Sequence, residues 1–201
     1  INEALQYSKL ETILVEEFIE GLEYSIEALH YDGKSEVIQF TEKTTTPFPY
    51  NVELGHKQPA NLSEEQKNNI KQLISKIADC MHFENCASHT ELKINDRGIF
   101  IIETSPRLGG DYITSTLVPL STGINIEDQL LNIALGNEVD STAIYSKCSG
   151  IRFFSFTVGD IVRNIPDKRM ILKWSNVMDY SFNLSINDSV KNITSSLNRY
   201  G

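Results

Sequence analysis

The sequence predicts an α+β fold in which an antiparallel sheet is flanked by helices and followed by a small β-rich C-terminal lobe. Two segments alternate between two faces on either side of a tight turn, as β-hairpins do. A capped segment between them carries apolar residues at helical spacing. Beyond Gly136 the chain becomes polar and then continues in short strand-like pieces. We therefore expect two domains, at residues 1–140 and 141–201.

Strands are predicted near the start of the chain. Residues 13–18 form a short apolar run, and residues 23–30 alternate between two faces. Asp32-Gly33 supplies the positive φ of a primed turn, so residues 35–41 are the returning strand. Residues 44–49 contain two prolines and predict a loop.

The helix signal is clearest at residues 63–81, where Ser63 and Gln66 form a capping box ahead of one apolar face. A second strand pair is predicted at 87–93 and 99–103, followed by a loop at 104–111. Residues 126–135 predict a helix ended by Gly136. Short strands are expected at 151–158, 161–164 and 177–184.

Composition excludes several functional classes. The 201 residues carry a formal net charge of −9 and no basic cluster, whereas nucleic-acid surfaces gather Lys and Arg. No run approaches membrane-spanning length. Three cysteines without CxxC spacing, Cys80, Cys86 and Cys148, favour free thiols in a reducing compartment. We therefore expect a cytoplasmic protein that binds neither nucleic acid nor membranes.

Two acidic residues of the second strand pair form the candidate site. Glu91 and Glu103 lie on adjacent predicted strands, and if they share a face they converge on one ion. Carboxylate oxygens suit Mg²⁺, and the hydroxyl of Ser105 adds a further oxygen. Arg107 offers a planar fork for a phosphate or carboxylate, and two glycines follow it closely. The alternative is a solvated pair of glutamates, but Glu103 ends an apolar run, where a charge needs a partner.

These residues stand in segments that resemble the ATP-grasp family. Residues 102–111 (IETSPRLGGD) are similar to the family's E-x-N/S-P-R-x-G-G segment, and residues 86–93 (CASHTELK) to the strand before it. Residues 15–25 (VEEFIEGLEYS) resemble the family's adenine-binding hinge. The likeness covers roughly residues 12–136 and is closest to amino-acid and dipeptide ligases and to the carbamoyl-phosphate synthetase and biotin carboxylase branch. It implies that residues 1–140 are the C-terminal part of an ATP-grasp domain.

The resemblance also implies a role for each candidate residue. The chain at Glu17, Phe18 and Ile19 would contact the adenine, and Glu23 would accept from the ribose hydroxyls. Glu16 and His56 are the other residues that would contact the nucleotide. A Mg²⁺ ion, with Mn²⁺ as the alternative, would be held by Glu91, Glu103 and Ser105. Ser105 stands where many relatives have Asn. Arg107 would be the catalytic residue that steadies the transferred phosphoryl group.

The implied activity is an ATP- and Mg²⁺-dependent joining of a small-molecule carboxylate to an amine through an acyl-phosphate. A carbamoyl-phosphate synthetase or carboxylase type of enzyme and a non-catalytic nucleotide-binding module stay open as alternatives, as does a homodimer. Full-length relatives carry an N-terminal domain and a glycine-rich phosphate loop ahead of the hinge, which this sequence does not contain. We therefore expect the isolated chain to bind ATP weakly and to turn over nothing.

Overall fold

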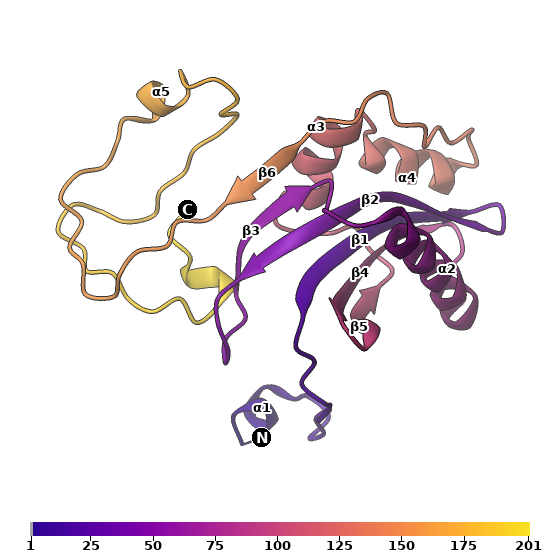
Figure 1. Cartoon of the computed structure of the whole chain (residues 1–201), viewed down its shortest axis with the longest axis horizontal. Helices are drawn as coiled ribbons and strands as arrows, with labels where there is room; N and C mark the ends of the chain where they lie inside the picture. Colours follow the sequence, from indigo (N-terminus) through magenta and orange to yellow (C-terminus); the bar gives the residue numbers. More distant parts are fainter. Residues whose placement is uncertain (1) are drawn as a thin grey trace.

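The fold is built on one antiparallel sheet, and the computed structural model describes residues 2–201. Six strands lie in the order β5-β4-β1-β2-β3-β6 (Figure 1). Their bounds are Leu22–Tyr31 (β1), Lys34–Thr45 (β2), Glu53–Gln58 (β3), Cys86–Asn95 (β4), Gly98–Ser105 (β5) and Ser149–Arg152 (β6). The β1–β4 pair joins the first hairpin to the second, so residues far apart in sequence share one surface.

Both predicted hairpins are confirmed. The first turns at Asp32 and Gly33, whose φ values of 51° and 70° are those of a primed turn. The second turns between Asn95 and Gly98, which pair directly with each other. The turn residues and the alternation therefore specified these strands locally.

The main core lies between the sheet and the long helix α2 (Glu64–Met81). The predicted capping box is present, because the Ser63 hydroxyl accepts from the Gln66 backbone N–H at 3.1 Å and the Gln66 side chain accepts from the Ser63 N–H at 2.9 Å. Ile70, Ile74 and Ile77 then pack against one face of the sheet. That face contributes Tyr24, Ile26, Ala28, Phe40 and Leu92.

Shorter helices cover one end of the opposite face. They are the π-helix η1 (Ile113–Leu117), α3 (Val118–Thr122) and the predicted helix α4 (Ile126–Leu135), which ends at Gly136 with a φ of 69°. Val118 of α3 and Ile126 and Ile133 of α4 pack on Leu29, Tyr31 and Ala87 of β1 and β4. The rest of this face carries polar side chains, which form the site described below.

Some elements differ from the prediction. Residues 12–20 form an irregular chain between helix α1 (Asn2–Tyr7) and β1, so the strand predicted at residues 13–18 is wrong. Leu14 and Val15 are 88% and 74% exposed and gain no strand partner, which means that apolar content alone misled the prediction. Strand β2 extends into the predicted loop as far as Thr45, and β3, η1 and α3 were not predicted.

The chain after Arg152 loops away from the sheet (Figure 1). Its regular structure is limited to α5 (Lys168–Ile171), the 3₁₀ helix η2 (Ser196–Asn198) and one isolated bridge between Ile161 and Ser189. The strands expected at 161–164 and 177–184 are irregular. The β-rich character of the C-terminal lobe is therefore not confirmed, and a boundary near residue 140 stays a prediction.

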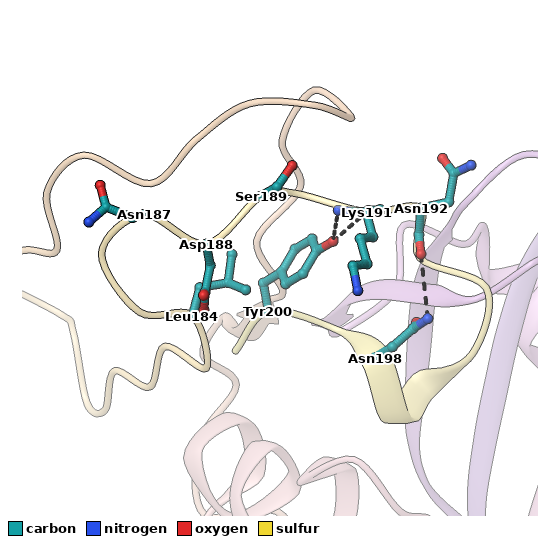
Figure 2. Close-up of a pocket in the computed structure, with 8 residues that line it drawn as sticks. All are labelled: Leu184, Asn187, Asp188, Ser189, Lys191, Asn192, Asn198 and Tyr200. Atoms are coloured by element: carbon teal, nitrogen blue, oxygen red, sulfur yellow. Dashed lines mark hydrogen bonds between the residues drawn. The ribbon is translucent and has the colours of Figure 1, made fainter.

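Aromatic rings pack against one another in this C-terminal segment, which also contains a pocket. The ring of Phe154 meets that of Phe182 edge to face with centroids 5.4 Å apart. A pocket of about 450 Å³ is lined by Tyr200, whose hydroxyl hydrogen-bonds to the backbone of Lys191 (Figure 2). No predicted site residue lines this pocket. None of the helices in residues 2–201 has the length and apolar character needed to cross a bilayer.

Candidate active site

The two candidate metal ligands face each other across neighbouring strands. Glu91 of β4 pairs directly with Glu103 of β5, so both side chains lie on the same face of the sheet. A β-bulge produces this arrangement, because the register shifts by one residue between Glu91, which pairs with Glu103, and Leu92, which pairs with Ile101. Strict alternation from Ile99 and Ile101 would have placed Glu103 on the α2 face. The bulged residue, Ile102, turns Glu103 onto the face that carries Glu91.

Ser105 and Arg107 lie close to this pair. The Ser105 hydroxyl donates to Oε1 of Glu103 at 3.2 Å. The Arg107 guanidinium approaches the same Oε1 at 4.0 Å and donates to the Leu108 carbonyl at 3.0 Å. Both charged side chains of this ion pair are more than half exposed, at 53% and 60%. The structure thus brings Glu91, Glu103, Ser105 and Arg107 together at one edge of the sheet.

A buried lysine links Glu91 to the other strands. The side chain of Lys43 on β2 is 1% exposed, and its Nζ lies 2.8 Å from Glu91, 3.0 Å from Glu23 and 3.3 Å from Glu53. Burial lowers the pKa of Lys43, but the three carboxylates outweigh it and hold the pKa above its ordinary value. Lys43 is therefore charged at the centre of an acidic cluster.

A histidine holds Glu91 from the other side. His89 Nδ1 lies 2.7 Å from Oε1 of the fully buried Glu27, and Nε2 lies 3.2 Å from Oε1 of Glu91. Burial lowers the pKa of His89, but hydrogen bonds and charges from the two glutamates outweigh it and raise the pKa to about 9. The His89 hydrogen bond is the largest cause that lowers the pKa of Glu91 to about 2, against opposing burial and with help from Lys43. The imidazolium therefore donates to both glutamates at neutral pH.

A second polar cluster borders the first. His56 on β3 is buried, and its Nε2 lies 3.5 Å from Asp111, which follows the loop of Arg107. Arg199 from the C-terminal segment donates to both carboxylate oxygens of Asp111 at 2.6 and 2.7 Å. These hydrogen bonds, first that of Arg199 and then that of His56, hold the pKa of Asp111 well below its usual range. The C-terminal segment is thereby tied to the loop that carries Arg107.

Four of the six predicted nucleotide residues lie along the irregular chain before β1, whereas Glu23 is on β1 and His56 on β3. Glu16 is exposed and Ile19 half-buried. Glu17 pairs with Arg97 at 2.9 Å, and the Phe18 ring lies 5.4 Å from that of Phe48 and 4.9 Å from the Lys93 ammonium. A pocket of about 550 Å³ lies between this segment and the β4–β5 turn. Glu23, for which a contact to the ribose stays a prediction, lies 3.0 Å from Lys43 and 3.8 Å from Lys93.

The donor set of the paired glutamates fits a magnesium ion. Glu91 and Glu103 offer carboxylate oxygens and Ser105 a hydroxyl, which are the hard ligands that Mg²⁺ and Mn²⁺ prefer. In residues 2–201 no three His, Cys, Asp or Glu side chains gather closely enough to enclose a metal ion by themselves. Mg²⁺ usually completes its ligand shell with phosphate oxygens and water.

Sequence reasoning missed six residues of these clusters. They are buried or paired, and they come from segments far apart in the chain: Glu27, Lys43, Glu53, His89, Asp111 and Arg199. One signal was available, since His89 and Glu91 are two residues apart on a predicted strand and must share a face. The others required the strand order.

Comparison with known proteins agrees with this geometry. A family model described as ATP-grasp domain matches residues 2–115. Alanine--anticapsin ligase of Bacillus amyloliquefaciens is 29% identical over 142 residues, covering 63% of this chain, which in turn spans only 29% of that relative. The structure of L-amino acid ligase from Bacillus licheniformis superposes with a TM-score of 0.73 at 22% identity, covering 88% of this chain and 45% of that one. Phosphoribosylglycinamide synthetase from Anaerococcus prevotii gives a TM-score of 0.70 at 22% identity, covering 100% and 51%. With more than half of its residues matched by the family model and the same fold in these structures, the chain belongs to the ATP-grasp family.

Proposed function

We propose that this protein is an ATP-dependent carboxylate–amine ligase in which Glu91 and Glu103 hold a divalent ion and Arg107 binds the transferred phosphoryl group. The observation that carries the proposal is the register of β4 and β5, which pairs the two glutamates on one face. The guanidinium of Arg107 lies 4.0 Å from Glu103. Carboxylates and a guanidinium side by side suit a magnesium-bound triphosphate.

The charges on the sheet explain why the nucleotide would bind together with a metal ion. The carboxylates of Glu23, Glu27, Glu53, Glu91 and Glu103 outnumber the nearby cations Lys43, His89, Lys93 and Arg107 by five to four. A bare triphosphate would be repelled by this surface. Bound Mg²⁺ would neutralise phosphate charge, which is the chemistry that the ion supplies.

The chain's own residues would act by holding and orienting groups. Lys43 and His89 both contact Oε1 of Glu91, which leaves Oε2 of that carboxylate for the ion. Arg107 would neutralise the phosphoryl oxygens as charge develops on them. Ser105 keeps Glu103 in place through its 3.2 Å hydrogen bond. Glu16, Glu17, Phe18 and Ile19, with His56, would contact the nucleotide.

In the proposed reaction, a carboxylate oxygen attacks the γ-phosphorus of ATP and ADP leaves, which forms an acyl-phosphate. The amine nitrogen then attacks the acyl carbon, and phosphate leaves with the oxygen that the carboxylate had donated. Both steps depend on alignment more than on covalent help from the protein. The substrates would be small molecules, one carrying a carboxylate and the other an amine.

The comparisons favour a ligase over a carboxylase within this family. Alanine--anticapsin ligase, by its name, acts on an amino acid, and it is 29% identical to this chain over 142 residues. The structure of L-amino acid ligase, at 22% identity, supports the fold alone. Structures of biotin carboxylases also match this chain, but at 16–18% identity, where the likeness supports the fold alone. A ligation of amino-acid-like substrates is therefore the proposed class.

The test uses the full-length protein and a carboxylate substrate labelled with ¹⁸O. Phosphate release from ATP is first screened against pairs of amino acids, with bicarbonate as the competing class. With an active pair, ¹⁸O should appear in inorganic phosphate. Label in AMP would instead mean adenylation, and turnover that depends on bicarbonate without an amine acceptor would favour a carboxylase. Glu103→Gln should lower turnover strongly, whereas unchanged turnover would favour a non-catalytic module.

We also propose that residues 1–201, expressed alone, bind Mg-ATP weakly and do not turn it over. The reason is the excess of carboxylates on the polar face together with the net charge of −9. Isothermal titration calorimetry measures this directly. Tight binding of Mg-ATP by this chain would contradict the expectation.

A further inference from the structure

The buried pair of Glu27 and His89 lies directly beneath the proposed metal site. The two residues face each other on β1 and β4, and they are 0% and 4% exposed. Their side chains meet at 2.7 Å between Oε1 and Nδ1. Burying a charged pair is costly and needs good partners, so its position on the functional face calls for an explanation.

The pair holds the carboxylate of Glu91 in one orientation. Glu91 is two residues after His89 on the same strand, and Nε2 of His89 lies 3.2 Å from its Oε1. Lys43 of β2, two strands away in the sheet, donates to the same oxygen at 2.8 Å. With the ring of His89 fixed at Nδ1 by Glu27, the Nε2 contact can restrain the Glu91 side chain.

The same pair also supports the loop that carries Arg107. A Cβ added at Gly109 would lie 2.7 Å from Oε2 of Glu27 and 2.8 Å from Nδ1 of His89. The loop backbone therefore rests against the pair, at a point where a side chain would not fit. Thr114, itself buried, anchors this contact by donating to the Gly109 carbonyl at 2.7 Å.

One atom of the pair has no partner. Oε2 of Glu27 is buried and makes no hydrogen bond among the described residues. A buried polar atom without a partner lowers the stability of the folded protein. A pair that served stability alone could be replaced by two well-packed apolar residues without loss, whereas a pair that positions neighbouring groups could not.

We infer that Glu27 and His89 are positioning residues, which orient the metal ligand Glu91 and seat the Gly109 loop so that Glu91, Glu103 and Arg107 face one point. This inference rests on the proposed function, because it assumes that Glu91 binds the ion. Neither residue would touch substrate or metal. Residues that orient metal ligands typically contribute about 10- to 100-fold to metal affinity.

The test measures Mn²⁺ affinity of the full-length protein by electron paramagnetic resonance, in the presence of a non-hydrolysable ATP analogue. His89→Gln and Glu27→Leu should each weaken Mn²⁺ binding about 10- to 100-fold. Glu27→Gln, which keeps an oxygen for Nδ1 of His89, should recover part of the loss. Gly109→Ala should weaken Mn²⁺ binding less than His89→Gln, because it displaces the loop and leaves the His89 contact to Glu91 in place.

His30→Gln is the matched control. His30 is a second buried histidine on β1, and it bonds Ser35 and Ser88 at 2.8 Å on the far side of the pair from Glu91. Its replacement should lower stability without changing Mn²⁺ affinity. If His89→Gln fails to fold, Glu27→Gln and Gly109→Ala decide the question.

Failure of the positioning role and failure of the metal site would give different results. Wild-type Mn²⁺ affinity in folded His89→Gln and Glu27→Leu, with binding lost in Glu91→Gln, would overturn the positioning role and leave the metal site standing. Wild-type affinity in both Glu91→Gln and Glu103→Gln would refute the metal site itself.

Discussion

Replacing Lys43 by Met would test how the acidic cluster is held together. The ammonium is the cation shared by Glu23, Glu53 and Glu91, at 3.0, 3.3 and 2.8 Å, and its side chain is 1% exposed. Removing one partner of a buried ion pair typically costs about 3–5 kcal/mol, because the remaining charges lose compensation. At about 2–4 °C per kcal/mol for a domain of this size, the melting temperature should fall by roughly 6–20 °C.

The stability lost in Lys43→Met should also depend on pH. The pKa of Glu91 is about 2 in the folded protein against an ordinary 4.5. A group whose folded pKa is depressed contributes stability above its unfolded pKa and loses that contribution as the pH falls through the folded value. The wild-type protein therefore loses this contribution between pH 4.5 and about 2. The difference in free energy of unfolding between the wild-type protein and Lys43→Met should therefore become smaller over the same pH range.

Scanning calorimetry at neutral and acidic pH would measure both effects. Lys57→Met is the matched control, since Lys57 is a lysine of neighbouring β3 whose side chain is 56% exposed and 3.6 Å from Glu42. Its replacement should change stability by no more than about 0.5 kcal/mol. If Lys43→Met loses less than about 1 kcal/mol of stability at neutral pH, or the same amount at all pH values, the acidic cluster does not depend on Lys43 in the way described.

Three other substitutions have definite expectations. The pKa of His89 is about 9 in the folded protein against an ordinary 6.5, so its contribution to stability is complete below pH 6.5 and should disappear as the pH rises through 9. Denaturation curves measured without metal should show this decline for the wild-type protein and not for His89→Gln. Arg199→Ala removes the hydrogen bonds of 2.6 and 2.7 Å to Asp111 and should lower the free energy of unfolding by about 2 kcal/mol. Limited proteolysis after residue 152 should become faster, and proteolysis at the wild-type rate would mean that these hydrogen bonds do not hold the C-terminal segment in place. Ser63→Ala removes the α2 cap and should cost about 1 kcal/mol in urea denaturation, whereas Ser63→Asp should be close to neutral, and equal losses in both would contradict the capping assignment.

Elements with strong local signals could be predicted from the sequence. The Asp32-Gly33 turn, the Ser63 capping box and Gly136 act within a few residues, so the hairpins, α2 and α4 are confirmed. The strand predicted at residues 13–18 failed because its only signal was apolar content, and a strand also needs a partner. Beyond β6, short apolar pieces misled the prediction in the same way.

The candidate site shows the same limit. The proximity of Glu91 and Glu103 followed from a hairpin, which is local, and the structure pairs them. Their shared face could not be derived, because it depends on the bulge at Ile102. The Lys43 cluster and the Asp111–Arg199 pair join segments 48 and 88 residues apart in sequence, so only the assembled sheet reveals them.

The bulge in β5 gives this strand one residue more than its pairing with β4 needs. Exchanging the side chain of Ile102, which is 43% exposed, alters packing at the rim and leaves the phase of the strand intact. Deleting Ile102 would remove the bulge and join Glu103 to Ile101, so that the two would alternate and Glu103 would still lie opposite Glu91. The β4–β5 hairpin can therefore lose one residue at this point without separating the two carboxylates.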